Sequence, residues 1–254
     1  MNSVSATVFS SIPELALVAA VLAVAQLVYV MFGFGAGLIA VGALALFLPD
    51  IKDAVVLLLL VNIPAELFVV WRSRREIRWR GILVICVGIA IGVPAGTAIL
   101  QLGDPSVVLT ILGLFLVAVG VLFLVLPEAR RIEDGVGRAS IIGLVSGVLS
   151  GLFGTGGPPL IVYFRLRGID KSAFRSHLMA IFLVVTAVRL PSYAFSGLLT
   201  APRLTSALVV LPAVLLGGFV GHKVHLSLSE RLFRRAVSVA LALLGVLLLA
   251  RHYA

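Results

Sequence analysis

Residues 150–159, SGLFGTGGPP, interrupt an apolar run that extends from residue 139 to residue 164. Four glycines and two prolines in ten residues cannot continue a helical hydrogen-bond ladder. Inside a bilayer, freed backbone groups are tolerated only where protein or a water-filled cavity satisfies them. The stretch therefore predicts a broken membrane element that lines a binding site.

Two prolines directly after the glycines indicate what this site binds. Proline is favoured in the first turn of a helix, so a new helix is expected to start near Pro158. Its free N–H groups and positive dipole end would favour an anion. The alternative is that these small residues only let helices pack closely. The predicted anion contacts, through backbone N–H groups and one hydroxyl, are Gly154, Thr155, Gly156 and Gly157.

Composition excludes a water-soluble globule, because 61% of the residues are hydrophobic, 12% are charged and the mean hydropathy is +1.20. The predicted fold is an all-α polytopic membrane protein, a single transmembrane domain over residues 1–254. The net charge of +9 is assigned to basic loops at the membrane, not to nucleic-acid binding. The eight apolar segments are residues 15–48 (interrupted), 54–71, 82–102, 107–126, 139–164 (interrupted), 173–199, 205–220 and 236–250.

An earlier stretch resembles the broken segment and predicts an internal repeat. Shifting the chain by 119 positions places Phe34, Gly35 and Gly37 on Phe153, Gly154 and Gly156. With six further residues inserted, Gly92 and Gly96 fall on Gly217 and Gly221. The repeats are predicted at about residues 13–126 and 139–251. A second, weaker set of anion contacts, with close packing as the alternative, is Gly33, Gly35 and Gly37.

Lys and Arg residues outside the apolar spans predict topology, because cytoplasmic loops carry an excess of them. If each broken segment crossed once, they would divide ten against eight. If each enters and returns on one side as a hairpin, they divide fifteen against three, with Lys52, Arg203 and Arg251 on the sparse side. The hairpin arrangement is therefore predicted, with both termini outside the cytoplasm and two inverted halves. Whether the hairpin arms cross fully or stop halfway is left open.

Two ionisable residues lie deep in apolar segments. Arg189 precedes Pro191 in residues 173–199, and a charge within a span suggests a counter-charge or an anionic ligand. The alternative for Arg189 is snorkelling to the interface. Glu66 is a candidate proton-coupling carboxylate or a partner for Arg189, with a structural helix–helix contact as its alternative.

Arg175 and His177 lie at the start of the same span as Arg189. They are candidates for an electrostatic entry that attracts anions. The alternative is that they are interfacial charges that set topology.

The run FGTGGPPLIVY at residues 153–163, its echo at residues 33–37 and the eight segments resemble the TauE/SafE sulfite exporter family, also called the toluene-sulfonate uptake permease family. The first repeat departs from the glycine-rich pattern at Ala36 and Leu38. The resemblance implies transport of sulfite, organosulfonates or related sulfur anions in a bacterial inner membrane.

The function expected is secondary transport of such an oxyanion by alternating access. Efflux is favoured because a potential negative inside moves an anion outward, by about 2.3 kcal/mol per charge per 100 mV. Uptake would need a coupling ion, with Glu66 as the candidate. A non-transporting membrane assembly subunit is the alternative from another class.

An enzyme is not expected, since Ser146, Ser150 and Thr155 have no intramembrane histidine to activate them. The histidines have no metal-ligand spacing, Cys86 is the only cysteine and no nucleotide-binding motif occurs, so no cofactor is expected. The expected partners are a small anion and the lipid bilayer, without nucleic acid. The oligomeric state is left open, with a homo-oligomer as one option.

Overall fold

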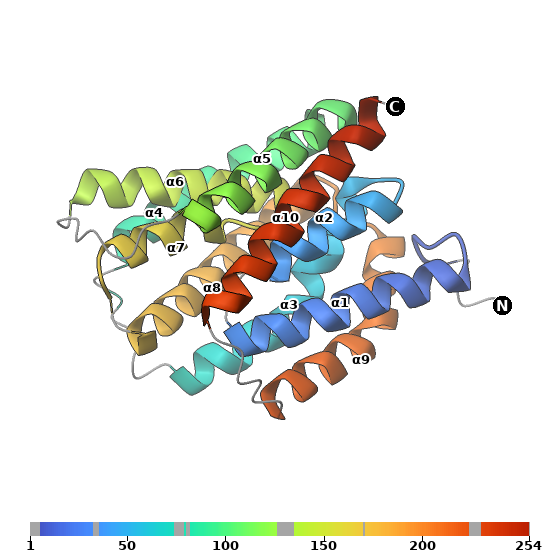
Figure 1. Ribbon diagram of the computed structural model, residues 1–254. Helices are drawn as coiled ribbons and strands as arrows, with labels where there is room; N and C mark the ends of the chain where they lie inside the picture. The colour runs from blue at the N-terminus through green and yellow to red at the C-terminus, as the bar shows by residue number, and fades with distance from the viewer. Residues whose placement is uncertain are drawn as a thin grey trace. The chain divides into compact units, whose positions relative to one another are not determined.

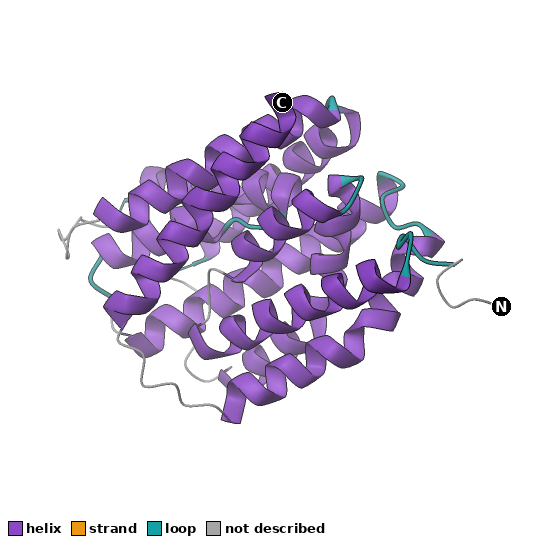
Figure 2. Ribbon diagram, turned by 45° about the vertical axis from the view of Figure 1, so that its right-hand side comes forward, coloured by secondary structure: helices purple, strands orange, loops and turns teal. Residues whose placement is uncertain are grey.

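The computed structural model describes residues 6–32, 36–73, 79, 82–125, 135–169, 171–223 and 230–253. These residues form ten α-helices and no strand (Figures 1 and 2). The prediction of an all-α protein is confirmed. The helices are α1 (Ile12–Phe32), α2 (Ala36–Phe47), α3 (Ile51–Ser73), α4 (Leu83–Leu102), α5 (Pro105–Val125), α6 (Val136–Phe153), α7 (Gly157–Leu166), α8 (Lys171–Phe195), α9 (Ala201–Lys223) and α10 (Glu230–Tyr253).

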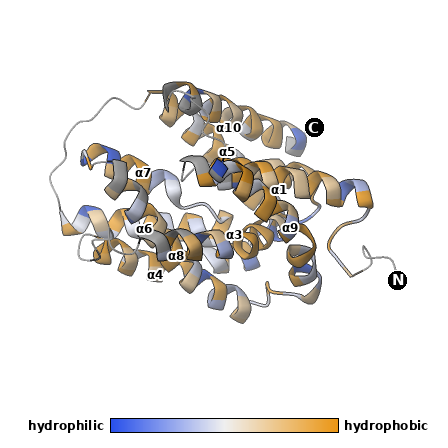
Figure 3. Ribbon diagram, turned by 90° about the horizontal axis from the view of Figure 1, so that it is seen from below, coloured by the Kyte–Doolittle hydropathy of each residue, from blue (hydrophilic) through white to orange (hydrophobic). Residues whose placement is uncertain are grey.

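Six of the described helices are long and apolar enough to cross a membrane, so the chain is a multi-pass membrane protein. Large apolar side chains such as Val87, Ile91 and Leu208 are exposed on them, as lipid-facing residues are. In Figure 3, most of the helical ribbon has the hydrophobic colour, and hydrophilic residues occur toward several helix ends. The count of eight segments stays a prediction. The six spans are Ile12–Val30, Leu83–Leu102, Pro105–Val125, Val136–Phe153, Ser176–Phe195 and Ala201–Gly221.

The chain divides into two compact units, and each contains helices from both predicted repeats. Unit 1 comprises Met1–Val61, Gly103–Leu126 and Leu199–Ala254, which include α1, α2, α5, α9, α10 and the start of α3. Unit 2 comprises Asn62–Leu102 and Pro127–Leu198, which include α4, α6, α7, α8 and the rest of α3.

In unit 2, α4 and α6 pack backbone against backbone. A Cβ atom on Gly92 would collide with the carbonyl oxygen of Leu144, and one on Gly151 would collide with the carbonyl oxygen of Val93. A Cβ on Gly147 would lie 2.9 Å from the Cα of Ile89. Small residues allow such close approach, which is how helices associate in membranes. This contact fixes the position of α6, the helix that precedes the Gly-Pro break.

In unit 1, α1 and α9 pack in a similar way. A Cβ on Gly217 would collide with the Ala23 carbonyl oxygen, and one on Gly221 would lie 2.6 Å from that of Leu27. Gly92 and Gly96, which the predicted repeat matches to Gly217 and Gly221, make the equivalent contacts with α6. The fourth helix of each predicted repeat therefore packs on the first helix of the other.

An ion-pair cluster joins the starts of α3 and α9 within unit 1. Arg203 Nε lies 2.7 Å from Asp53 Oδ1, and Arg203 Nη2 lies 3.1 Å from Asp50 Oδ2. Burial raises the pKa of the Asp53 carboxyl above its ordinary value, and the Arg203 guanidinium acts against that rise. The α2–α3 junction and the start of α9 therefore lie at one end of unit 1.

Val8 and Arg251, described residues near the two termini, lie at this same end. The Val8 N–H donates to Ser206 Oγ over 2.9 Å, and Arg251 Nη1 donates to the Leu46 carbonyl oxygen. Figure 1 shows the start of α1 and the end of α10 on the same side of this unit. The hairpin arrangement requires Lys52, Arg203 and Arg251, the three basic residues on the side poor in Lys and Arg, to lie at one end. If each broken segment crossed the membrane once, the α2–α3 junction would lie at the opposite end from the termini.

The α4–α6 contact predicts a difference between two Gly→Ala substitutions. Gly92→Ala is expected to lower the free energy of unfolding by about 1–3 kcal/mol, since its Cβ must displace the α6 backbone. Gly137→Ala, in the first turn of α6, meets nothing within 4 Å and is expected to be neutral or slightly stabilising. Thermal unfolding of the detergent-solubilised proteins measures both. Equal stability of the two variants would contradict the packing described.

Candidate functional site

The break between α6 and α7 is three residues long, from residue 154 to residue 156, not the ten that the sequence suggested. Residues 150–153 stay helical because their side of α6 is packed on α4. The helix ends where Gly154 adopts a left-handed conformation (φ 76°) and donates its N–H to the Ser150 carbonyl oxygen over 2.9 Å. The expected helix start near Pro158 is confirmed, with α7 beginning at Gly157.

The chain reverses direction at this break. Gly156 lies against the carbonyl oxygen of Ser146 and the hydroxyl of Ser150, whereas a continuing helix would carry it about 15 Å beyond Ser146. Figure 1 shows α7 returning beside α6, and the two helices are in contact. With ten residues, α7 is about 15 Å long, half the thickness of the hydrocarbon core. This hairpin therefore has one long arm and one half-length arm.

The prolines reduce the number of N–H donors at the start of α7. Of its first three residues, Gly157, Pro158 and Pro159, only the glycine carries an N–H. Among the described residues, no hydrogen-bond partner is found for the amides of Thr155, Gly156 and Gly157. The start of α7 thus offers an anion fewer backbone N–H groups than the sequence pattern suggested. Side chains must therefore supply more of the contacts to a bound anion.

Two hydroxyl groups beside the break are buried without a hydrogen-bond partner among the described residues. Thr155 is 7% exposed, Ser146 is fully buried, and neither Thr155 Oγ1 nor Ser146 Oγ has a partner. A buried polar group left unpaired costs about 1–3 kcal/mol, so such a group usually meets a ligand or an ordered water.

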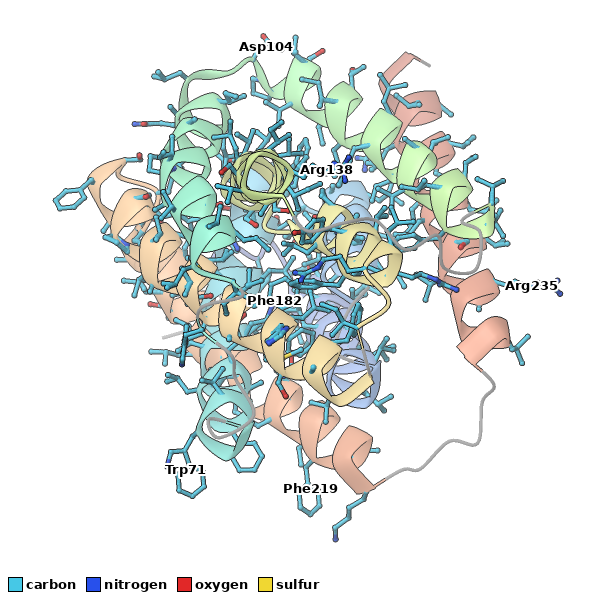
Figure 4. All side chains as sticks on the ribbon, turned by 90° about the vertical axis from the view of Figure 1, so that its left-hand side faces the viewer. Trp71, Asp104, Arg138, Phe182, Phe219 and Arg235 are labelled. Atoms are coloured by element: carbon cyan, nitrogen blue, oxygen red, sulfur yellow. The ribbon has the colours of Figure 1, made fainter. Side chains whose placement is uncertain are left out.

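The two glycines before Pro158 differ in their surroundings. Gly156 has no room for a side chain, because α6 fills the position of its Cβ. A Cβ on Gly157 would lie 3.4 Å from Cζ of Phe182, an ordinary contact; Figure 4 labels this phenylalanine on α8. Gly156 is therefore required for packing, as the alternative proposed, whereas Gly157 is not.

Arg189 on α8 reaches the break. It is 4% exposed, and a Cβ on Gly154 would lie 2.7 Å from Arg189 Nη2. Its guanidinium carbon lies 4.7 Å from the ring centroid of Tyr193, whose hydroxyl donates to the Gly151 carbonyl oxygen over 2.7 Å. Tyr193 thereby holds the arginine and satisfies an α6 carbonyl near the helix end. The Arg189 side chain is therefore buried within the protein.

Glu66 on α3 contacts the face of α8 that also carries Arg189. It is 6% exposed, and its Oε2 accepts a 2.6 Å hydrogen bond from Thr186 Oγ1. Arg189, three residues after Thr186, acts electrostatically on this carboxylate. Among the buried described residues, Glu66 is the acidic side chain and Arg189 the guanidinium.

The other predicted site residues lie elsewhere or cannot be placed. His177 is 6% exposed with its ring centroid 5.9 Å from that of Phe164, so it does not present an open entry to solvent. The side chain of Arg175 lies outside the described residues, as do Gly33 and Gly35. Gly37 lies in the first turn of α2, in unit 1.

Sequence reasoning missed Thr186 and Tyr193. They stand three residues before and four residues after Arg189, the spacing at which side chains share a helix face. That spacing was available as a signal once Arg189 had been singled out.

The arrangement is suited to binding a small anion. A buried guanidinium, the unpaired Thr155 hydroxyl and the free amides around Gly157 are all donors. No group of three His, Cys, Asp or Glu side chains that could hold a metal ion occurs in the described ranges.

Comparison with known proteins is consistent with this chemistry. Residues 17–248 match the family described as sulfite exporter TauE/SafE. The chain is 28% identical over 222 residues to the probable sulfite/organosulfonate exporter TauE of Cupriavidus necator, covering 85% of this chain and 86% of that protein. It is 28% identical over 192 residues to the probable inner membrane transporter protein TsaS of Comamonas testosteroni, covering 75% and 80%. No solved structure matches the chain.

The contact between Gly154 and Arg189 predicts different effects for two Gly→Ala substitutions. Gly154→Ala and Gly197→Ala both force alanine into a positive φ, of 76° and 68°, and both are expected to lose about 1–2 kcal/mol of stability. Only the Cβ at residue 154 meets the guanidinium, whereas nothing lies within 4 Å of that at residue 197. Gly154→Ala should therefore also weaken anion binding, measured as anion-induced thermal stabilisation. Equal stabilisation of both variants would show that Arg189 is not part of the anion site.

Proposed function

Because the chain belongs to the sulfite exporter TauE/SafE family, we propose that it exports a small sulfur-containing oxyanion, sulfite or an organosulfonate, across the bacterial inner membrane. The family is one of transporters, not of enzymes. The proposed binding site is the hairpin tip between α6 and α7, with Arg189 as its anchor.

The observation that carries this proposal is the buried guanidinium of Arg189 beside the Gly154 break. A planar guanidinium can donate two parallel hydrogen bonds to two oxygens of a sulfite or sulfonate group. The Thr155 hydroxyl and the Gly157 amide, both unpaired among the described residues, are donors for the remaining oxygen. A buried positive charge of this kind selects anions over cations and neutral solutes.

Export is supported by the description of one relative, the Cupriavidus necator protein, as an exporter. Uptake remains the alternative direction and would require a coupling ion, for which Glu66 is the candidate. A non-transporting assembly subunit would show no flux of any anion.

Alternating access between two inverted halves is the proposed mechanism. It is supported by the matched glycines, since α4 packs on α6 in unit 2 as α9 packs on α1 in unit 1. The hairpin placement of Lys52, Arg203 and Arg251 at one end supports the inversion.

Flux assays in proteoliposomes test the site. With sulfite, thiosulfate, sulfoacetate and an aryl sulfonate as cargoes, Arg189→Gln is expected to lower flux at subsaturating cargo by about 30-fold or more, since losing a buried charged contact costs about 2–5 kcal/mol. Thr155→Val is expected to lower it about tenfold.

The matched control is Thr97→Val, which removes a buried hydroxyl that bonds the Val93 carbonyl oxygen of its own helix. It should leave flux near the wild-type value. Substitution of Gly156 would not distinguish binding from packing. Wild-type flux in Arg189→Gln would exclude the proposed site, and no flux of any cargo in the wild type would favour the assembly subunit.

Thiol labelling tests the proposed orientation. In a Cys86→Ser background, cysteines at Asp104, Arg138 and Arg235, exposed residues labelled in Figure 4, report on loops expected on opposite sides. A membrane-impermeant maleimide should label Asp104→Cys in intact spheroplasts, and Arg138→Cys and Arg235→Cys only after permeabilisation. The reverse pattern would place the termini in the cytoplasm.

A further inference from the structure

Unit 2 buries one carboxyl group and one guanidinium close to the Gly154 break. They belong to Glu66 and Arg189, at 6% and 4% exposure, and an ionised Glu66 would balance the charge of Arg189 only while no anion is bound. The Thr186 hydroxyl bonds the carboxylate of Glu66 and stands three residues from Arg189 on α8. In a low-dielectric interior, such charges are tolerated when they compensate each other.

A bound monovalent anion would disturb this balance. With cargo on Arg189, the site would hold two negative charges and one positive charge. On α8 the groups around the pair are Thr186 and Tyr193, which are uncharged at neutral pH, and His177 stands twelve residues before Arg189. The buried described residues of α4, α6 and α7 include no ionised side chain. Among the buried described residues of unit 2, Glu66 is the carboxylate that a proton can neutralise, and its protonation would restore neutrality.

We propose that Glu66 takes up a proton whenever Arg189 takes up the cargo anion, so that one proton crosses with each monovalent anion. The empty site holds a carboxylate and a guanidinium, and the loaded site holds a carboxylic acid, a guanidinium and the anion. Both states have zero net charge, the proton comes from the side of loading and it leaves with the anion on the other side. This inference rests on the proposed function and defines its coupling.

Thr186 is the positioning residue in this scheme. Its hydroxyl donates to Glu66 when the carboxyl is ionised, and its oxygen can accept the carboxyl proton when Glu66 is protonated. The side chain of Glu66 can therefore remain in place through the cycle.

Electroneutral coupling changes what drives transport. The membrane potential performs no work on a cycle that moves no net charge. Export is then driven by the concentration gradient of the cargo. The pH gradient adds to or opposes this driving force, and the direction of transport reverses when the two gradients reverse. By thermodynamic linkage, a lower pH strengthens anion binding to the same extent that the anion strengthens proton binding.

Methanesulfonate is the appropriate probe, because it is the anion of a strong acid and cannot itself carry protons at neutral pH. Proteoliposomes with an internal pH indicator and a potassium diffusion potential allow anion, proton and charge movement to be followed together. In the wild type, an inward methanesulfonate gradient is expected to acidify the lumen with one proton per anion. Steady-state accumulation should be unchanged by an imposed 100 mV potential.

Glu66→Gln is expected to convert the carrier to charge-moving transport. Protons should no longer accompany the anion, and 100 mV should change accumulation by up to about 50-fold. Glu66→Asp should retain proton movement, and Thr97→Val should match the wild type in every measurement. If Glu66→Gln does not fold, Thr186→Val is the second variant, and it is expected to shift the pH dependence of flux.

Each result supports or overturns the coupling. Wild-type methanesulfonate flux without proton movement, or accumulation driven by the potential, would overturn it while leaving anion transport intact. Proton movement that persists in Glu66→Gln, or an unchanged pH profile in Thr186→Val, would remove the role of Glu66. Absence of any anion flux in the wild type would contradict the proposed function and the coupling with it.

Discussion

A helix that ends within a bilayer must have its free backbone groups satisfied by protein or by water in a cavity, because hydrocarbon offers no hydrogen bonds. In unit 2 the end of α6 meets this requirement through α8 and through its own last turn. The Tyr193 hydroxyl donates to the Gly151 carbonyl oxygen, and the Gly154 N–H bonds the Ser150 carbonyl oxygen. Tyr193 also supports the Arg189 guanidinium beside Gly154. The residues that make the break tolerable therefore also place a positive charge at it.

That positive charge sets the second condition, since a buried guanidinium needs a counter-charge. The proposed counter-charge is Glu66 on α3, which accepts a hydrogen bond from the Thr186 hydroxyl on α8. The repeat predicted from the sequence matches these two positions to Val185 and Val70. The charges thus come from equivalent helices of the two predicted halves, and both belong to unit 2. These residues therefore form a single polar centre within unit 2, not two symmetry-related centres, one in each predicted half.

Close packing is the condition for both features. The glycine faces of α4 and α6 bring their backbones into contact, and Gly156 lies against Ser146 and Ser150. The break is therefore fixed on a rigid helix pair. Such rigidity suits a binding site. Donors that are already held in place lose little conformational entropy when the anion binds.

The sequence by itself determined the all-helical membrane fold, the family and the position of the Gly-Pro break, and it singled out Arg189 as a charge within an apolar segment, because hydropathy, glycine, proline and charge act locally. It also favoured the hairpin, since basic residues report on topology. Tertiary structure decided how far helix α6 extends, that Gly156 packs on α6, that His177 is buried and that Thr186 joins Glu66 to the face of Arg189. These depend on contacts between residues far apart in the chain, which local patterns do not encode.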